Sequence, residues 1–252
     1  MFVVAIVSAS GGTGKTSLTA NLASLLTRRE QPVLAVELDP SNRLGLYLGL
    51  TVRNPTGIVD LSADQTWHHA AQRNADHVNL LHFGHGVNTH RTHEKLSVIE
   101  SRGVRDFLLD LSPPSGCIVL IDTQRAPSLC FDCALAAADL ILHVITAQPG
   151  CFEDIAVMHA HYERRFSAEP EHAPGLFHVL NKVNSAKLLS DDIIGILRVR
   201  LKSKMLRYAI HQDEAIPEAM ASNQCVADYA PHSQASHDLQ GLADWLLAQP
   251  AH

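Results

Sequence analysis

The part of the chain with the clearest chemical potential is the glycine-rich run Ser8–Ser17, which reads SASGGTGKTS. It directly follows an apolar segment, Phe2–Val7, and its last residues begin a helical pattern. Closely spaced glycines allow a tight turn that presents backbone N–H groups to phosphate oxygens. We therefore predict a phosphate-binding loop whose ligand-contacting residues are Gly11, Gly12, Thr13, Gly14, Lys15, Thr16 and Ser17.

Lys15 and Thr16 determine the chemistry that this loop can support. We expect the Lys15 ammonium group to reach the β and γ phosphates of ATP, and the Thr16 hydroxyl to bind Mg²⁺. Both residues begin a helix, whose dipole favours anions at its N-terminus. The pattern G-x-x-x-x-G-K-[ST] is met except at its first glycine, which is Ala9. The alternative interpretation is a glycine-rich β–α turn that contains a lysine by chance.

Two carboxylates follow predicted strands and could complete a catalytic site. Asp39 follows the strand Val33–Leu38, and a carboxylate at that edge of a parallel sheet can activate a water molecule. Asp122 follows the strand Cys117–Ile121, and we predict that it holds magnesium together with Thr16. The alternatives are a turn or helix-capping role for Asp39 and a turn role for Asp122.

Short apolar runs alternate with segments of helical period along the whole chain. The predicted strands are Phe2–Val7, Val33–Leu38, Val78–Phe83, Cys117–Ile121, Leu140–Thr146, Leu176–Leu180 and Leu206–Ile210. The predicted helices are Thr16–Arg29, Asp60–Arg73, His90–Leu109, Phe152–Phe166, Ala186–Lys202 and Ser236–Leu247. This alternation predicts an α/β fold with a doubly wound, mostly parallel sheet of about seven strands. The loops between these elements are too short to be domain linkers, so we expect a single domain over residues 1–252.

The composition excludes several classes of protein. Hydrophobic residues make up 46% of the 252 residues and charged residues only 18%, which excludes a disordered chain. No apolar run reaches the roughly 18 residues of a membrane-spanning helix, and the first residues lack the features of an export signal. The formal net charge of −6 argues against a dominant interaction with nucleic acid. With five cysteines and no export signal, we expect reduced thiols in a cytoplasmic protein.

The adjacent glycines in GGTGKTS resemble the deviant Walker A loop of the ParA/MinD ATPases, which are P-loop NTPases of the SIMIBI type. The resemblance implies a homodimer that sandwiches ATP and Mg²⁺. In that family a second, signature lysine precedes the glycine pair and reaches the phosphates of the partner subunit. This chain has Ser10 at that position, and serine carries no positive charge. Because such a charge stabilises the transition state, we expect slow or partner-dependent hydrolysis.

The same resemblance assigns roles to other residues. Asp39 matches the residue that orients the attacking water, so Lys15 and Asp39 are the predicted catalytic residues. Asn181 matches the asparagine that recognises adenine, and an amide can both donate to and accept from that base. His211 and Asp213 lie in the segment that matches the second base-side loop. Glu37 and the segment Gln124–Pro127 depart from the family pattern; the latter is the expected switch II.

Several segments without catalytic residues are similar to one branch of that family, the BcsQ proteins of cellulose biosynthesis. They are Trp67–Ala70, Arg73, Leu80–Gly84, His211–Ala215, Val226–Tyr229 and Leu242–Trp245. This resemblance implies an ATP-binding homodimer that supports assembly or localisation of the bacterial cellulose synthase complex. In some bacteria the partners are the short protein BcsR and the c-di-GMP sensor BcsE. Such a protein would be cytoplasmic and recruited to the inner membrane through partners, without direct insertion.

Other features have simpler interpretations. The histidines between His68 and His93 do not have the spacing of a tetrahedral metal site, and the CxxC Cys130–Cys133 is more typical of buried thiols. We interpret the basic run Arg198–Arg207 as a solvated helix end, and the last helix as one that packs on the sheet. Two other functions stay open: a partition or positioning ATPase that acts on DNA or membrane, and an ATP-dependent ligase on the same fold.

Overall fold

The computed structural model describes residues 1–50, 56–61, 70–85, 103–110 and 112–249. A seven-stranded sheet runs through it in the order β3-β4-β2-β5-β1-β6-β7. The strands are β1 (Phe2–Val7), β2 (Val33–Leu38), β3 (Gln72–Arg73), β4 (Asn79–Leu81), β5 (Ile118–Thr123), β6 (Leu140–Thr146) and β7 (Gly175–Asn181). All neighbouring pairs are parallel except β3 and β4. The predicted doubly wound α/β fold is confirmed.

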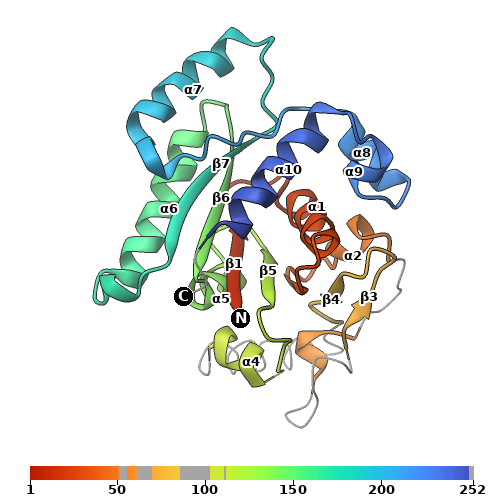
Figure 1. Cartoon of the computed structure of the whole chain (residues 1–252). Helices are drawn as coiled ribbons and strands as arrows, with labels where there is room; N and C mark the ends of the chain where they lie inside the picture. Colours follow the sequence, from red (N-terminus) through yellow and green to blue (C-terminus); the bar gives the residue numbers. More distant parts are fainter. Residues whose placement is uncertain (51–55, 62–69, 86–102, 111, 250–252) are drawn as a thin grey trace.

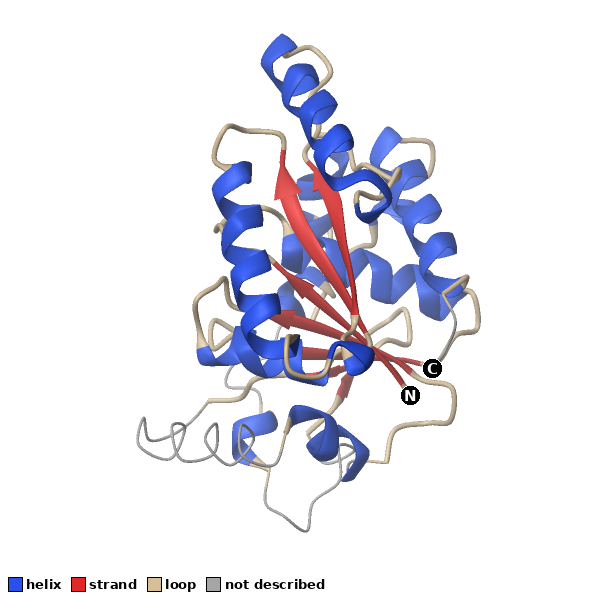
Figure 2. Ribbon diagram, turned by 90° about the vertical axis from the view of Figure 1, so that its left-hand side faces the viewer, coloured by secondary structure: helices blue, strands red, loops and turns tan. Residues whose placement is uncertain are grey.

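Helices lie on both faces of the sheet, as the two perpendicular views show (Figure 1, Figure 2). They are α1 (Lys15–Arg28), α2 (Leu44–Tyr47), α4 (Val104–Asp110), α5 (Leu129–Ala137), α6 (Cys151–Phe166), α7 (Leu188–Leu201), α8 (Ala215–Ala221), α9 (Val226–Tyr229) and α10 (Gln234–Leu247). Single 3₁₀ turns occur at Ile58–Asp60, Pro170–His172 and Lys202–Lys204. None of the described helices is long and apolar enough to cross a membrane.

Each face of the sheet has its own apolar core, because successive residues of a strand point to opposite sides. On one face, alternate residues of β1 such as Val4 and Ile6 pack with α1, α8, α9 and α10. On the other face, Val3 and Ala5 pack with α4, α5 and α6. The strands are therefore apolar throughout, as expected for strands that are covered on both sides.

The last helix packs on the sheet, as predicted. Leu239, Leu242 and Leu246 of α10 are buried in the same core as α1. The Ser233 side chain caps the helix by accepting a hydrogen bond from the backbone N–H of Ser236. α10 thus covers α1, the helix that begins at the phosphate loop.

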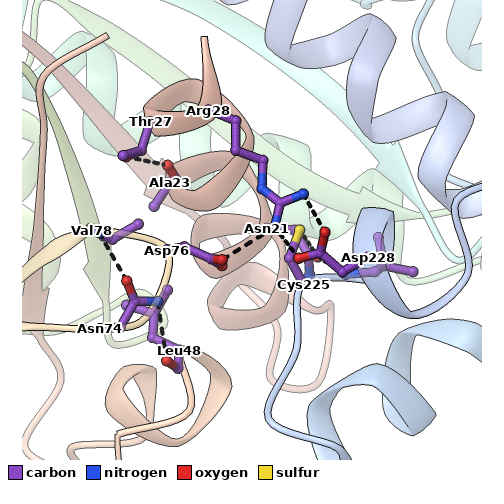
Figure 3. A network of polar contacts seen from close by, with 11 residues as sticks. Asn21, Ala23, Thr27, Arg28, Leu48, Asn74, Asp76, Val78, Cys225 and Asp228 are labelled. Atoms are coloured by element: carbon purple, nitrogen blue, oxygen red, sulfur yellow. Dashed lines mark hydrogen bonds and ion pairs between the residues drawn. The ribbon is translucent and has the colours of Figure 1, made fainter. Parts of the chain in front are cut away.

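Polar contacts also fix the position of α1 (Figure 3). Arg28 near its C-terminus pairs with both Asp76 and Asp228, and the hydrogen bond with Asp228 raises the pKa of Arg28. In the middle of the helix, the Asn21 side-chain oxygen accepts hydrogen bonds from the backbone N–H of Val226 and the thiol of Cys225. Because these contacts tie α1 to the β3–β4 turn and to α9, the phosphate loop at its other end is held firmly.

Two predicted elements differ from the structure. Leu206–Ile210 is not a strand: it runs beside β7, but only two of its backbone N–H groups, those of Leu206 and Ile210, donate to that strand. The segment Asp60–Arg73 is predicted to be helical, but its described ends are not: Asp60 ends a 3₁₀ turn and Gln72–Arg73 forms β3, while residues 62–69 lie outside the described ranges. The sheet therefore keeps seven strands, but its outermost members are β3 and β7.

A local turn explains why Gln72–Arg73 is a strand. The Asn74 side-chain oxygen accepts a hydrogen bond from the backbone N–H of Val78, and its backbone oxygen accepts one from His77. This tight reversal brings Gln72–Arg73 antiparallel to β4. Of the predicted helix His90–Leu109, residues 90–102 lie outside the described ranges, and α4 forms the remainder from Val104.

Candidate nucleotide site

The phosphate loop lies between β1 and α1, at the carboxyl ends of the parallel strands. Two of its glycines need their conformational freedom, because Gly12 and Gly14 have positive φ angles of 73° and 92°. A Cβ atom on Gly14 would also lie only 2.3 Å from the Asn181 side-chain nitrogen. The glycine spacing in the sequence thus reflects both backbone conformation and close packing.

Lys15 lies inside the loop. Its Nζ donates a hydrogen bond of 2.8 Å to the Ser8 hydroxyl, which in turn donates to the backbone oxygen of Ser10. Burial lowers the pKa of Lys15, and the nearby carboxylates of Asp122 and Asp39 oppose that shift. A half-buried ammonium group with a single hydroxyl acceptor is suited to receive phosphate oxygens.

The predicted magnesium ligands lie together. The Thr16 hydroxyl donates a 2.8 Å hydrogen bond to Asp122 Oδ2. Asp122 is only 1% exposed, and its other oxygen, Oδ1, has no hydrogen-bond partner although it is buried. Burial raises the pKa of Asp122 to about 7. An unpartnered buried carboxylate oxygen beside a hydroxyl fits a hard cation such as Mg²⁺, whose bound waters would satisfy it.

The two carboxylates near the end of β2 have different surroundings. Asp39 lines the same cavity as Lys15, and its Oδ1 also accepts a hydrogen bond from the backbone N–H of Ser41. Asp39 therefore both stabilises the turn after β2 and lines the cavity. Glu37 is fully buried instead, where its Oε1 accepts a hydrogen bond from the backbone N–H of Leu44 and its Oε2 lies 3.5 Å from His82 Nδ1. Glu37 thus anchors the start of α2.

Ser10, at the position of the family's signature lysine, has a local partner. Its hydroxyl donates a 2.6 Å hydrogen bond to Asp154 Oδ1 in the first turn of α6. That contact places an acid, rather than a base, beside this part of the loop. Ser10 itself therefore supplies no positive charge to this edge of the phosphate loop.

Two adjoining cavities surround the loop. The first, of about 550 Å³, is lined by Lys15, Thr16 and Asp39 and holds the phosphate side. The second, of about 290 Å³, is lined by Asn181, His211 and Asp213, the predicted base-side residues, together with apolar side chains. Both are also lined by Gly14, Ser17, Tyr47 and Lys182, so they are continuous. The shape suits a ligand with a charged tail and a flat, less polar head.

The predicted base-side residues also make contacts within the chain. The Asn181 amide nitrogen donates to the backbone oxygen of Thr13, and its oxygen accepts from the backbone N–H of Lys182. An amide has two N–H groups and two oxygen lone pairs, so one of each stays available to a base. His211 Nδ1 lies 2.8 Å from Asp238 Oδ2, which also accepts from the His211 backbone N–H.

Asp213 has a structural task that the sequence did not indicate. Its two carboxylate oxygens accept hydrogen bonds from the backbone N–H groups of Ala215 and Ala235, at the starts of α8 and α10. Both oxygens are therefore already engaged. Asp213 shapes the wall of the base-side cavity by holding these two helices together.

Sequence reasoning did not identify Lys182 and Tyr47 as site residues. The Lys182 ammonium group donates a 2.8 Å hydrogen bond to the backbone oxygen of Gly12, across the mouth of the loop. The dipeptide Asn181–Lys182 at the end of an apolar strand was the available signal for the lysine. No sequence signal indicated Tyr47, since it reaches the site from the end of α2.

The remaining sequence features lie elsewhere. All five cysteines are buried thiols, and burial raises the pKa of Cys130 to about 12. The basic residues Arg198, Arg200, Lys202, Lys204 and Arg207 are exposed around the end of α7, as predicted for a solvated helix end. Trp67, His68, His69, His90 and His93 lie outside the described residues.

Comparison with known proteins agrees with this geometry. The family model for "Cellulose biosynthesis protein BcsQ" matches residues 1–247. BcsQ of Salmonella typhimurium is 26% identical over 253 residues, covering 100% of this chain and 96% of that protein. BcsQ of Escherichia coli K12 is 26% identical over 250 residues, covering 98% and 94%. The chromosome-partitioning ATPase Soj of Thermus thermophilus is 25% identical over 249 residues, covering 98% and 95%.

Solved structures show the same fold. Cobyrinic acid a,c-diamide synthase from Mycobacterium smegmatis, with bound ADP and magnesium, has a TM-score of 0.78 at 18% identity and covers 98% of this chain and 94% of its own. The septum site-determining protein MinD from Pyrococcus horikoshii, complexed with Mg-ADP, has a TM-score of 0.70 at 22% identity and covers 97% and 95%.

The fold and the phosphate loop define the class: this is an α/β protein with a glycine-rich phosphate loop, with the fold of MinD and a sequence similar to that of the chromosome-partitioning ATPase Soj. The BcsQ family model covers nearly the whole chain, so the family of this protein can also be stated. The chain belongs to the BcsQ family of cellulose biosynthesis proteins.

Proposed function

We propose that this chain binds ATP and Mg²⁺ and that the bound nucleotide controls a homodimer that supports the bacterial cellulose synthase complex. The observation that supports nucleotide binding is the unpartnered Oδ1 of Asp122, which lies beside Thr16 near the half-buried Lys15. These groups need an anion and a cation to complete their contacts, and Mg·ATP supplies both. Membership of the BcsQ family supports the cellulose part of the proposal.

In the proposed mechanism the chain's own groups bind and orient the triphosphate. Lys15 exchanges the Ser8 hydroxyl for phosphate oxygens, and the Thr16 hydroxyl, which donates its proton to Asp122, would offer an oxygen lone pair to the metal. Magnesium, when bound, neutralises charge on the β and γ phosphates. Asp39 orients a water molecule, while Asn181, His211 and the backbone around Asp213 hold the base. Switch segments would adopt different conformations with and without the γ-phosphate. This change would shift the equilibrium between monomer and homodimer.

Ser10 is the basis for proposing slow or partner-dependent hydrolysis. A homodimer built like a nucleotide sandwich would receive no lysine from this position, and its hydroxyl is engaged with Asp154. Loss of one positive charge at a phosphoryl-transfer site costs orders of magnitude in rate. An ATP-bound state that persists suits an assembly factor on the cytoplasmic side, recruited to the inner membrane through partners such as BcsR and BcsE.

Calorimetry with Mg·ATP tests the site. Lys15→Ala should abolish measurable binding, because the loop loses the lysine that would contact the phosphates. Lys187→Ala is the matched control, since Lys187 is an exposed lysine at the start of α7, away from both cavities. Undiminished affinity in Lys15→Ala would refute the nucleotide site, whatever the outcome for the cellulose complex.

A second experiment separates this proposal from a partition or positioning ATPase. The ATP-loaded protein would be incubated with subunits of the cellulose synthase complex, with random-sequence duplex DNA, and with vesicles that contain anionic lipid. We expect retention by the cellulose synthase subunits alone. Retention by DNA or vesicles without those subunits would favour the alternative, to which Soj-like relatives lend weight.

A further inference from the structure

Arg125 lies over the phosphate loop although it is not part of it. It follows β5 closely, three residues after Asp122. The next residue, Ala126, donates a 3.0 Å backbone hydrogen bond to the Ser8 oxygen, which ties this segment to the loop. An added Cβ on Gly11 would lie 3.9 Å from Arg125 Cδ, so the arginine stem passes above that glycine. Arg125 lines the phosphate-side cavity together with Lys15.

Arg125 is an exposed side chain in the described part of the chain. Within the ranges that the structure describes, its guanidinium group makes no ion pair and no hydrogen bond, whereas Lys15 donates to Ser8 and Lys182 to Gly12. Arg125 and Lys15 line the same cavity. Two cations that face one cavity repel each other unless an anion lies between them.

Resting on the nucleotide site proposed above, we infer that Arg125 contacts the terminal phosphate of the nucleotide bound in its own subunit. It would thereby supply in cis a positive charge that Ser10 cannot supply across a dimer. The guanidinium group suits this contact, because its planar array of N–H donors can bind two phosphate oxygens at once. The terminal phosphate is favoured over the others because Arg125 lines the same cavity as Lys15, which would reach the β and γ phosphates.

The test compares binding of a triphosphate and a diphosphate. Calorimetry with the Mg²⁺ complexes of AMP-PNP, a non-hydrolysable ATP analogue, and of ADP would be carried out on full-length Arg125→Gln. We expect affinity for AMP-PNP to fall about tenfold or more and affinity for ADP to change less than about twofold. Arg125→Lys should recover part of the loss, since it restores the charge without the planar donors.

Two controls make the result specific. Arg165→Gln removes an exposed arginine in the last turn of α6, outside the phosphate-side cavity, and should bind both nucleotides like the unsubstituted protein. Every titration would be repeated at a protein concentration at which sedimentation shows a monomer. The loss in Arg125→Gln should persist there, because the contact lies within one subunit.

Three results would overturn the inference. They are an unchanged preference for AMP-PNP over ADP in Arg125→Gln, an equal loss for both nucleotides, and a loss that appears only in the dimer. The first leaves the proposed nucleotide site intact as long as the unsubstituted protein binds AMP-PNP. If the unsubstituted protein binds neither nucleotide, the proposed function itself fails. A circular dichroism spectrum of each variant checks separately that the variant is folded.

Discussion

Replacing Gly14 by alanine should damage the protein in two ways at once. The φ angle of 92° at Gly14 is unfavourable for any residue with a Cβ, at a cost of about 1–3 kcal/mol. The new Cβ would also lie 2.3 Å from the Asn181 side-chain nitrogen. Asn181 would have to move and give up its 2.7 Å hydrogen bond to the Thr13 oxygen, which leaves buried polar groups unpaired at about 1–3 kcal/mol. Together these effects predict a loss of about 2–6 kcal/mol in unfolding free energy.

Urea unfolding followed by circular dichroism measures this loss. Gly195→Ala is the matched control: Gly195 lies within α7, and an added Cβ there meets no atom within 4 Å. The same chemical change should therefore stabilise the protein by about 0.5–1 kcal/mol, because alanine favours helix more than glycine does. Opposite signs at the two glycines are the expected result.

A double-mutant cycle separates the two causes. Removing the clashing amide with Asn181→Ala should make Gly14→Ala less costly than it is in the original background, so the two losses would not add. Purely additive losses would mean that backbone strain acts alone. If Gly14→Ala unfolds at the same urea concentration as the unsubstituted protein, the reasoning about this close packing is wrong.

Two further substitutions test other parts of the structure. Asp213→Ala should lower the unfolding free energy by about 1–3 kcal/mol, since two backbone N–H groups lose their acceptor, and urea unfolding will show it. Below pH 6.5 the protein should lose stability, because burial lowers the pKa of His178 to about 4 and the unfolded chain takes up the proton first. The contribution is about 1.4 kcal/mol per pH unit down to pH 4. His178→Gln should flatten that slope in unfolding curves measured between pH 7.5 and pH 4.5, whereas replacing the exposed His232 by glutamine should change it little. An equal slope in all three proteins would contradict the assignment.

Much of the site could be predicted from the sequence because its key groups are local. The loop Ser8–Ser17 brings glycines, a lysine and a hydroxyl into one turn, and β1 fixes where that turn lies. Asp122 could also be predicted, because a carboxylate at the end of an apolar parallel strand arrives at the same edge of the sheet. The BcsQ resemblance likewise depended on sequence alone, and the family match bears it out.

The local sequence pattern was insufficient where contacts with neighbouring segments determine whether a segment forms a strand. The apolar run Leu206–Ile210 has the composition of a strand, but it lies beside the edge strand β7 and forms only part of a ladder. Gln72–Arg73 has little strand character, yet the Asn74 turn pairs it with β4. Propensity is a weak guide at a sheet edge, since pairing depends on the neighbour that happens to be present.

By itself the sequence determined the phosphate loop, the alternation of strands and helices, and the absence of a lysine at Ser10, because each depends on residue type and short spacing. Only the tertiary structure decided that Asn181 closes over Gly14, that Asp213 joins two helices, and that Arg125 lines the same cavity as Lys15. Those relationships join residues that are distant in the chain. They arise when parallel strands deliver their loops to one edge of the sheet, and no local pattern encodes which loops will meet there.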